Sequence, residues 1–378
     1  MGKRLEIKIG DLLESDAQTL VNTVNCVGVM GKGIALDFKN RFPDMYRDYV
    51  EKCKMGKVRL GKPYLYKGLT PPWVLNFPTK DHWRSVSKLD DIITGLEYIL
   101  EHYEKWGIES IAVPPLGCGH GQLRWKEVGP LLYHYLSRTD IQVELFAPFD
   151  TPAEQLKIEF LERTPKYLDE RKSMAILDSD PGIAAIVEIV KRLQNEECHW
   201  PIGRTTFQKI AYVATFRGLP TGLFYQRGSY GPFSKDLKRV QTDLVNKRIL
   251  NEQRNGKIFM VSTGPAYEDN MDHYHDLVKD WDDDIEAIKN LFKRIRSATQ
   301  AEIVATVLFI SDELKRKGIK RPSERDILEE VEKWKIRRRP QLDYEYVAYT
   351  IRNLNSMGWL DLEYSNDLPV SSDLLTTA

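Results

Sequence analysis

Residues 19–41, TLVNTVNCVGVMGKGIALDFKNR, combine a short apolar run, a glycine-containing loop and an amphipathic segment. The apolar run ends at Asn22, and the loop that follows carries Gly28, Gly31 and Gly33. Because glycine has no Cβ, such a loop at the start of a helix lets backbone N–H groups surround a phosphate. The stretch predicts a strand, an anion-holding loop and a helix N-terminus, although many glycine loops are only turns.

The composition is that of a globular protein with more than one domain. A chain of 378 residues exceeds what one hydrophobic core usually fills, and 42% hydrophobic and 29% charged residues are ordinary values. The 55 basic and 55 acidic residues cancel, and they nearly cancel within each half of the chain. This balance excludes a protein that binds nucleic acid through bulk positive charge, so any nucleic acid must be bound by local contacts.

Cysteine and histidine spacings indicate neither a disulfide scaffold nor a metal site. Cys26, Cys53, Cys118 and Cys198 form no CxxC pair, and no HxxxH or HExxH pattern occurs. We therefore expect no metal and no cofactor. The chain starts without an apolar signal core and has no apolar run of about 18 residues, so we expect a cytoplasmic protein without membrane contact.

Up to residue 152 the pattern alternates between strands and helices that are long enough to cross over a sheet. The expected strands are 5–9, 20–22, 64–66, 73–77, 108–115 and 143–146, and the expected helices are 37–53, 89–103 and 125–136. This alternation predicts a three-layer α/β domain that ends near residue 152.

Three further segments are expected at the carboxyl ends of strands, where ligands bind in open α/β sheets. Asp11 follows the first strand, Lys80 follows the strand at 73–77, and a second glycine loop, LGCGHG at 116–121, follows the strand at 108–115. Each side chain also has an ordinary interpretation, which is a turn cap for Asp11 and a solvated surface residue for Lys80.

Two glycine loops that face each other across a sheet edge suit a diphosphate with a ribose at each end. Neither loop has the GxGxxG pattern of dinucleotide-binding folds, and Lys32 is followed by Gly33 rather than by the Ser or Thr of a P-loop. A GxSxG elbow is also absent, so a serine hydrolase is unsupported.

Four motifs together resemble the macrodomain family, which binds ADP-ribose. They are GDL at 10–12, VNTVN at 21–25, GKGIA at 31–35 and PPLGCG at 114–119. The segment NFPTK at 76–80 with Trp83 is similar to the DarG branch, the antitoxins of DarT–DarG pairs. The resemblance covers roughly residues 1–150. It implies a three-layer α/β fold with a mixed central sheet and removal of the ADP-ribose that DarT-type toxins attach to thymidine in single-stranded DNA.

The resemblance also implies roles for matching positions. Asp11 and Leu12 would hold the adenine, and Asn22 would orient the distal ribose. Lys80 would carry the catalysis, either by attacking the anomeric carbon as a neutral amine or by stabilising charge. The remaining expected contacts with ADP-ribose come from the two loops: Gly31, Lys32, Gly33, Ile34, Gly117, Cys118, Gly119, His120 and Gly121.

One position departs from the related branch of terminal ADP-ribose glycohydrolases, in which an aspartate of the second loop acts with the lysine. Here the matching residue is Gly121. This casts doubt on a lysine–aspartate mechanism and on release of ADP-ribose from acidic side chains, and it leaves Lys80 to act with Asn22, water or the substrate's own groups. His82 and His120 flank the site as candidate acids or bases, and ordinary loop histidines are the alternative.

Residues 153–181 are rich in charge and are expected to form a linker that includes a helix at 153–162. Residues 182–378 are expected to be mainly helical, and three helices followed by a hairpin are typical of a winged helix-turn-helix. A second and weaker occurrence of a similar order of helices later in the chain predicts two units. They are 182–265 and 298–365.

The run 268–286 carries nine acidic residues and one lysine, and Tyr267, Tyr274 and Trp281 lie among them. Its ordinary interpretation is a solvated helix face or loop. Alternatively, the carboxylates imitate phosphates and occupy the DNA channel of a cognate DarT-type toxin, with the aromatic side chains packing there. The basic cluster of Lys333, Lys335 and residues 337–339 favours DNA binding by this region instead.

Two functions follow from these observations. The first is an antitoxin that hydrolyses the N-glycosidic bond between ADP-ribose and thymidine in single-stranded DNA, and whose C-terminal half neutralises the toxin. The alternative is an ADP-ribose reader, or a hydrolase of ADP-ribose derivatives, with a DNA-binding winged-helix half that acts as a regulator.

Overall fold

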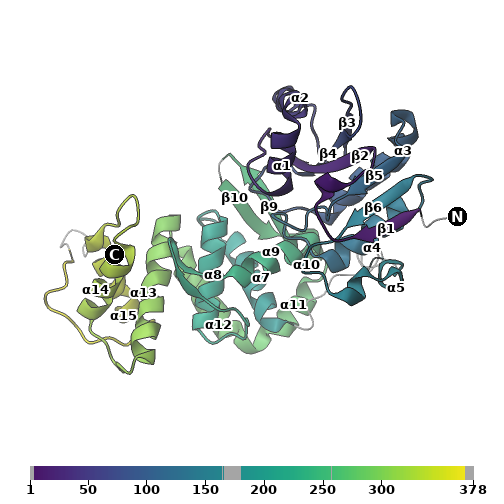
Figure 1. The fold of residues 1–378 in the computed structure, drawn as a ribbon. Coiled ribbons are helices and arrows are strands. Elements are labelled where there is room, and N and C mark those ends of the chain that lie inside the picture. Colours follow the sequence, from purple (N-terminus) through teal and green to yellow (C-terminus); the bar gives the residue numbers. More distant parts are fainter. Residues whose placement is uncertain (1–3, 164, 166–179, 257, 371–378) are drawn as a thin grey trace. The chain divides into compact units, whose positions relative to one another are not determined.

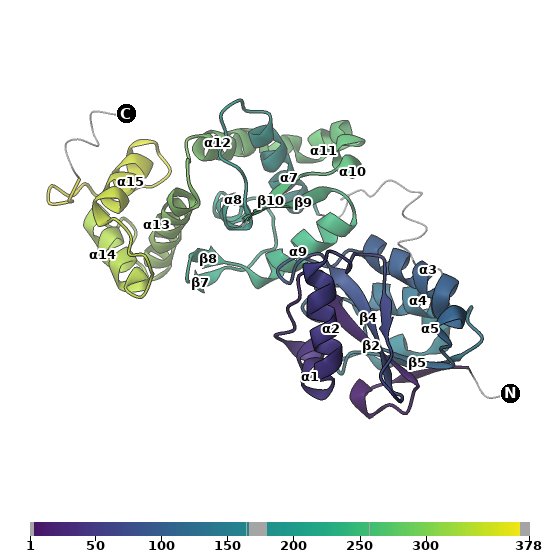
Figure 2. The same ribbon diagram turned by 90° about the horizontal axis from the view of Figure 1, so that it is seen from above.

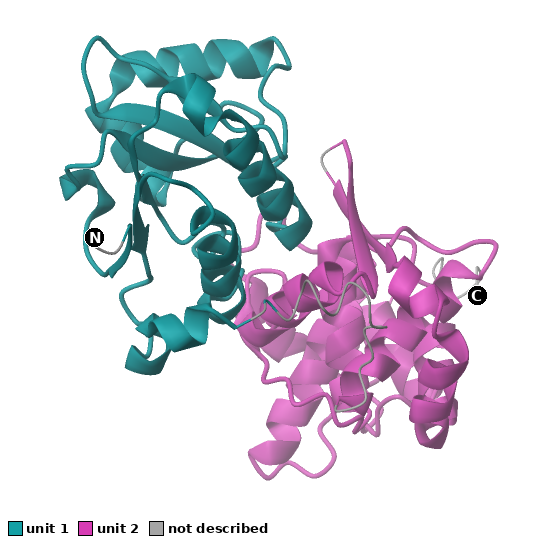
Figure 3. Ribbon diagram, turned by 90° about the vertical axis from the view of Figure 1, so that its right-hand side faces the viewer, with its two compact units in different colours: residues 1–174 teal, residues 175–378 magenta. Residues whose placement is uncertain are grey.

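The computed structural model describes residues 4–163, 165, 180–256 and 258–370. The chain divides into two compact units, which we call the first unit, residues 1–174, and the second unit, residues 175–378 (Figure 3). Residues 166–179 of the expected linker and the expected frayed tail at 371–378 lie outside the described residues.

A six-stranded mixed sheet forms the middle of the first unit (Figure 1), with the order β1-β6-β5-β2-β4-β3. Its strands are β1 (Leu5–Lys8), β2 (Thr19–Asn25), β3 (Tyr64–Tyr66), β4 (Trp73–Lys80), β5 (Ser110–Val113) and β6 (Gln142–Phe146). All neighbouring strands are parallel except β3, which is antiparallel to β4. The carboxyl ends of the five parallel strands therefore share one edge.

Helices cover both faces of this sheet (Figure 2): α1 (Gly33–Arg41) and α2 (Pro43–Lys54) on one face, and α3 (Leu89–Trp106) and α4 (Trp125–Leu136) on the other. Successive strand residues point to opposite faces, so Leu20 packs in the core beneath α1 and α2 while Val21 packs in the core beneath α3 and α4. The expected three-layer α/β architecture with a mixed sheet is confirmed.

Two boundaries differ from the expectation. The single helix expected at 37–53 is two helices, because Pro43 lacks the N–H that a continuous helix needs and instead starts α2. Strand β4 continues to Lys80, beyond the expected end at Phe77. The strand tolerates Pro78 because β3 pairs only with residues 74–76 and leaves that side of the strand without a partner.

Residues 153–162 were expected to lie in the linker as one helix. They form a 3-10 turn, η2 (Ala153–Leu156), and a short helix, α5 (Ile158–Leu161). Leu161 is fully buried in the core beneath α4, and Trp125 Nε1 donates a hydrogen bond to Gln155 O over 3.3 Å. The two segments therefore pack onto the first unit.

The second unit is mainly helical, as expected. Its elements are α7 (Pro181–Gln194), α8 (Arg204–Phe216), β7 (Gln226–Gly228), β8 (Gly231–Phe233), α9 (Lys235–Asn246), β9 (Leu250–Asn255), β10 (Ile258–Thr263), α10 (Pro265–Glu268), α11 (Met271–Val278), η3 (Lys279–Trp281), α12 (Asp282–Lys293), α13 (Ala298–Arg316), α14 (Glu324–Lys335) and α15 (Tyr344–Ser356). The hairpin β9–β10 follows α9 in the predicted order.

Helix α13 packs against both α8 and β8, so the two predicted helical units share a core. Among the described residues that follow α15, no pair of strands corresponds to the hairpin β9–β10. In the part of the chain that the structure describes, every helix is too short or too polar to cross a membrane.

Candidate functional site

The two glycine loops and Lys80 meet at the carboxyl edge of the parallel strands. Lys80 ends β4, is only 8% exposed, and its Nζ donates a hydrogen bond to His120 O over 2.5 Å. A Cβ at Gly33 would lie 3.8 Å from Cδ2 of His120, so the start of α1 lies against the second loop. The convergence follows from topology, because β2, β4 and β5 run in the same direction.

Asn25 organises the first loop, although it is not among the site residues expected from the sequence. Its Oδ1 accepts hydrogen bonds from the N–H groups of Val27 (3.0 Å) and Val29 (3.3 Å), and its Nδ2 donates to Val29 O (2.6 Å). The hydroxyl of Tyr49 donates to Asn25 O over 2.7 Å. An asparagine at the end of a strand often bonds to backbone two residues further on, and this signal could have identified it.

The first loop leads into the N-terminus of α1. Lys32 occupies the N-cap position, and because a lysine side chain has no acceptor, no side chain caps the first turn. Gly33 has a φ of +55°, which favours glycine. The amide groups of this turn, with the positive end of the helix dipole, suit an anion.

The second loop is closed by backbone hydrogen bonds from Leu123 N to Gly117 O (3.1 Å) and from Ser87 N to Gly121 O (3.2 Å). A Cβ at Gly121 would lie 2.2 Å from Gly117 O and 2.4 Å from Ser87 Oγ. No side chain fits at this position without a change of the loop, so an aspartate here would require a different loop conformation.

Asn22 lies deeper than the two loops. It is fully buried on the α1–α2 face of the sheet, where its Nδ2 donates to Asn76 Oδ1 over 3.0 Å and lies 3.9 Å from Met30 Sδ. Among the described residues no atom hydrogen-bonds its Oδ1. Its role toward the distal ribose stays a prediction.

Asp11 and Leu12 lie at the end of β1. Asp11 Oδ1 accepts a hydrogen bond from Leu13 N (2.9 Å) and caps the 3-10 turn η1 (Leu12–Glu14), and Leu12 is buried in the core. The structure thus shows the ordinary role of Asp11 as a cap, and adenine binding stays a prediction for both residues.

Phe149 was also not selected from the sequence. Strand β6 ends beside β1, since Ala147 N donates to Lys8 O over 2.9 Å, and Phe149 follows with 80% of its surface exposed. It therefore lies near the same strand ends as Asp11. The sequence feature that could have identified it is an aromatic residue just beyond the last strand.

Two histidines and two cysteines lie near the loops, and the role of either histidine as an acid or base stays a prediction. His82 Nδ1 accepts a hydrogen bond from Arg84 N over 3.2 Å, which ties the ring into a turn, and His120 is exposed. Burial raises the pKa of the Cys26 and Cys118 thiols to about 12. Both thiols are protonated at neutral pH, so neither is an activated nucleophile.

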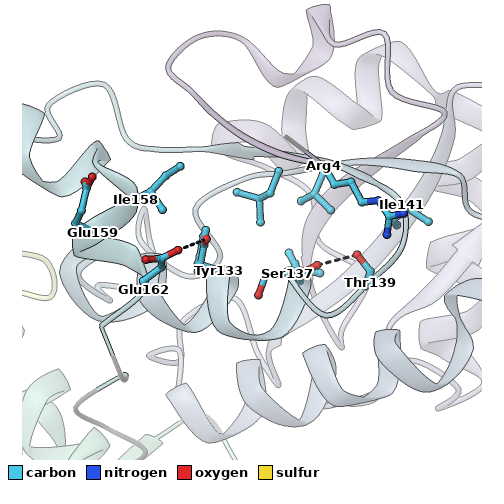
Figure 4. A pocket seen from close by; sticks show the side chains of 11 residues that line it. Arg4, Tyr133, Ser137, Thr139, Ile141, Ile158, Glu159 and Glu162 are labelled. Atoms are coloured by element: carbon cyan, nitrogen blue, oxygen red, sulfur yellow. Dashed lines mark hydrogen bonds between the residues drawn. The ribbon is translucent and has the colours of Figure 1, made fainter. Parts of the chain in front are cut away.

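A cavity of about 410 Å³ lies at the opposite edge of the sheet, where β1 and β6 begin (Figure 4). Arg4, Tyr133, Ile141 and Glu162 are among its lining residues, and the hydroxyl of Tyr133 donates to Glu162 Oε1 over 3.0 Å. It contains none of the residues expected to bind ADP-ribose.

In the second unit the acidic run makes internal ion pairs. The pairs are Glu268–Lys191 (2.6 Å), Asp282–Arg192 (2.5 Å), Asp284–Arg217 and Glu286–Lys289 (2.6 Å). Tyr267 and Tyr274 are fully buried and their rings stack with centroids 4.9 Å apart. The expectation that these two rings pack against a partner is wrong, because they belong to the core of the unit itself.

Side chains of the basic cluster also form ion pairs within the second unit. Lys335 and Arg338 bind the buried carboxylate of Glu302 at 2.9 and 3.1 Å, and Lys333 pairs with Glu330 at 2.9 Å. Lys333, Arg337 and Arg339 remain exposed, so DNA binding through this cluster stays a prediction. Within the described ranges, no group of His, Cys, Asp and Glu side chains is arranged to hold a metal ion.

Comparison with known proteins agrees with this arrangement. Residues 21–132 match the Macro domain family. The chain is 36% identical over 235 residues to the DNA ADP-ribosyl glycohydrolase of Thermus aquaticus, covering 61% of each chain. It is 40% identical over 184 residues to a DNA ADP-ribosyl transferase-DNA ADP-ribosyl glycohydrolase fusion protein of Thermosipho africanus, covering 44% of this chain and 46% of the relative.

Among solved structures, the macrodomain of Thermus aquaticus DarG is 42% identical and matches 38% of this chain and 98% of that chain, with a TM-score of 0.37. The chain spans 61% and 46% of the lengths of the two curated relatives. The first unit of this chain therefore contains a macrodomain, and its sequence is similar to those of DNA ADP-ribosyl glycohydrolases.

Proposed function

We propose that this protein removes ADP-ribose from thymidine in single-stranded DNA by hydrolysing the N-glycosidic bond. The observation that carries the proposal is the position of Lys80, which ends β4 where the two glycine loops meet and whose Nζ lies 2.5 Å from His120 O. The similarity to proteins named DNA ADP-ribosyl glycohydrolase supports the choice of substrate.

In this proposal the diphosphate binds the backbone amides of residues 29–34 and 117–121. The adenine lies at the ends of β1 and β6, where Asp11 offers a carboxylate and the exposed ring of Phe149 offers a stacking surface. The distal ribose extends toward Lys80, and one of its hydroxyl groups donates to Asn22 Oδ1.

The reaction breaks the bond between the anomeric carbon and the base nitrogen. One water molecule supplies the oxygen that bonds to the anomeric carbon, and one of its protons goes to the base nitrogen, so the products are ADP-ribose and unmodified DNA. Lys80 acts in one of two ways. As an ammonium group it stabilises negative charge on the departing base. As a neutral amine it displaces the base and forms a C–N bond that water then hydrolyses.

The test is incubation with a single-stranded oligonucleotide that carries ADP-ribosyl thymidine. We expect free ADP-ribose and the intact oligonucleotide, and much slower release from an ADP-ribosylated glutamate peptide, because Gly121 supplies no carboxylate. Tight binding of the modified oligonucleotide without release would contradict the proposal and favour a reader.

We also propose that the second unit binds a DarT-type ADP-ribosyltransferase. The relative in which a transferase is fused to a glycohydrolase supports this partner. Within the acidic run 268–286, Asp272 and Asp276 are exposed on α11, one turn apart, and are candidate contacts. The double variant Asp272→Lys/Asp276→Lys is expected to lose protection against a co-expressed toxin, while Glu345→Lys on α15 keeps it. Equal protection by both variants would exclude these two aspartates as a contact with the toxin.

A second candidate function, DNA binding by the second unit, is favoured by one observation. Helix α9 exposes Lys235, Lys238 and Arg239 and packs beside β9 of the hairpin. Titration of the whole protein with unmodified duplex DNA tests it. A reader or regulator requires binding that weakens steeply with salt and is lost in Lys238→Glu/Arg239→Glu, and weak, salt-insensitive binding would exclude it.

A further inference from the structure

We propose that His82, Trp83 and Arg84, which we call the Trp83 stack, bind an unpaired base that neighbours the modified nucleotide. This inference rests on the proposed function, because it concerns the DNA strand that carries ADP-ribose. It assigns to the first unit a second binding surface, specific for single-stranded nucleic acid.

The Trp83 stack lies at the tip of a turn that both glycine loops hold in place. Cys26 N, in the first loop, donates to Asp81 O over 3.2 Å. Ser87 N donates to Gly121 O, in the second loop, over 3.2 Å, and Ser85 N donates to His82 O over 2.9 Å within the turn. The tip is therefore fixed beside the site, two residues beyond the end of β4 at Lys80.

The side chains of the stack form an ordered and exposed surface. The rings of His82 and Trp83 stack with centroids 5.3 Å apart and planes 28° apart, and Arg84 Cζ lies 4.4 Å from the Trp83 ring centroid. Trp83 is nevertheless 46% exposed, and it belongs to neither hydrophobic core of the first unit. The turn is anchored through backbone groups, so the exposed indole is not needed to hold it.

Such a surface matches the chemistry of a single DNA strand. Every base has a π-face, and stacking on aromatic or guanidinium planes is how proteins bind unpaired bases without reading their sequence. The whole chain carries no net charge, so affinity for DNA must come from local contacts. In the Trp83 stack the rings offer stacking, and the guanidinium of Arg84 offers a contact for an adjoining phosphate.

Two substrates test the inference with the whole protein: an ADP-ribosylated single-stranded oligonucleotide, and ADP-ribosyl thymidine without flanking nucleotides. We expect Trp83→Ala to lower kcat/KM about tenfold for the oligonucleotide, mainly through KM, and to leave the mononucleoside unchanged. Trp83→Phe should keep most of the activity. Leu69→Ala, which removes a fully exposed side chain at the opposite edge of the sheet, is the matched control.

An equal loss on both substrates would show a structural role for Trp83, and no loss on either would remove it from DNA binding. If the wild-type protein hydrolyses neither substrate, the proposed function fails. The inference is then decided by binding of the modified oligonucleotide, measured by fluorescence anisotropy. It survives only if Trp83→Ala weakens this binding while the affinity for free ADP-ribose stays unchanged.

Discussion

Each unit of this protein contains a buried lysine that donates a hydrogen bond to a backbone carbonyl. Lys80 in the first unit is 8% exposed and its Nζ lies 2.5 Å from His120 O. Lys209 in the second unit is 2% exposed and its Nζ lies 2.7 Å from Pro232 O. Burial, with a smaller contribution from the nearby charge of Lys335, lowers the pKa of Lys209 to about 7.

The surroundings of the two lysines differ. Lys209 lies within α8 beneath the β7–β8 hairpin, where a Cβ at Gly231 would touch its Cε at 3.3 Å, so protein atoms fill the space around it. Lys80 lies at a strand end, with its Nζ bonded to the second glycine loop at His120 O. Burial and a carbonyl partner therefore do not distinguish the two lysines, and what sets Lys80 apart is its position at the strand ends beside the glycine loops.

The largest expected effect separates the two lysines by activity. Lys80→Ala should lower turnover of ADP-ribosylated single-stranded DNA by about 10³-fold, because it removes the group that either stabilises negative charge on the departing base or displaces the base. The affinity for ADP-ribose should be retained. Lys209→Met should keep full activity. Single-turnover rates and calorimetric titration with ADP-ribose measure both quantities, and undiminished turnover in Lys80→Ala would remove Lys80 from the mechanism.

The next effect concerns the second glycine loop. Gly121→Ala places a Cβ 2.2 Å from Gly117 O, so the loop must shift, and we expect ADP-ribose affinity to fall by about one to two orders of magnitude. Gly68→Ala, in the loop between β3 and β4, is the matched control, since the nearest atom to a Cβ there is Thr70 O at an ordinary 3.4 Å. Equal affinities of the two variants would show that the loop does not hold the diphosphate.

The smallest effect is a change in the pH dependence of stability. The pKa of Lys209 is lower in the folded state, about 7, than its usual 10.5, so between these values the unfolded chain binds one more proton. Stability of the wild-type second unit should therefore rise with pH above 7. Lys209→Met should lack this increment, which is on the order of 1–2 kcal/mol between pH 7 and 9. Urea unfolding at both pH values measures it, and parallel pH profiles would contradict the assignment.

Local sequence patterns were sufficient for most of the first unit. Alternating apolar residues and glycine loops predicted the three-layer architecture, and the direction of parallel strands predicted that both loops and Lys80 share an edge. The helix boundary at Pro43 was readable from the chemistry of proline, although the periodicity across it suggested a single helix. In the second unit the order of helices and hairpin was also readable from the sequence.

The environment of individual side chains was not readable in this way. The hydrogen bonds of Asn25 and the exposure of Phe149 and Trp83 are known only from the structure, and Tyr267 and Tyr274 proved to be core residues. Gly121 is visible in the sequence as a departure from the related branch, but its close contact with Gly117 O and Ser87 Oγ is known only from the structure. The physical reason is common to all of these cases. Periodicity and turn chemistry depend on neighbours along the chain, whereas burial, ion pairing and close contacts depend on residues that folding brings together.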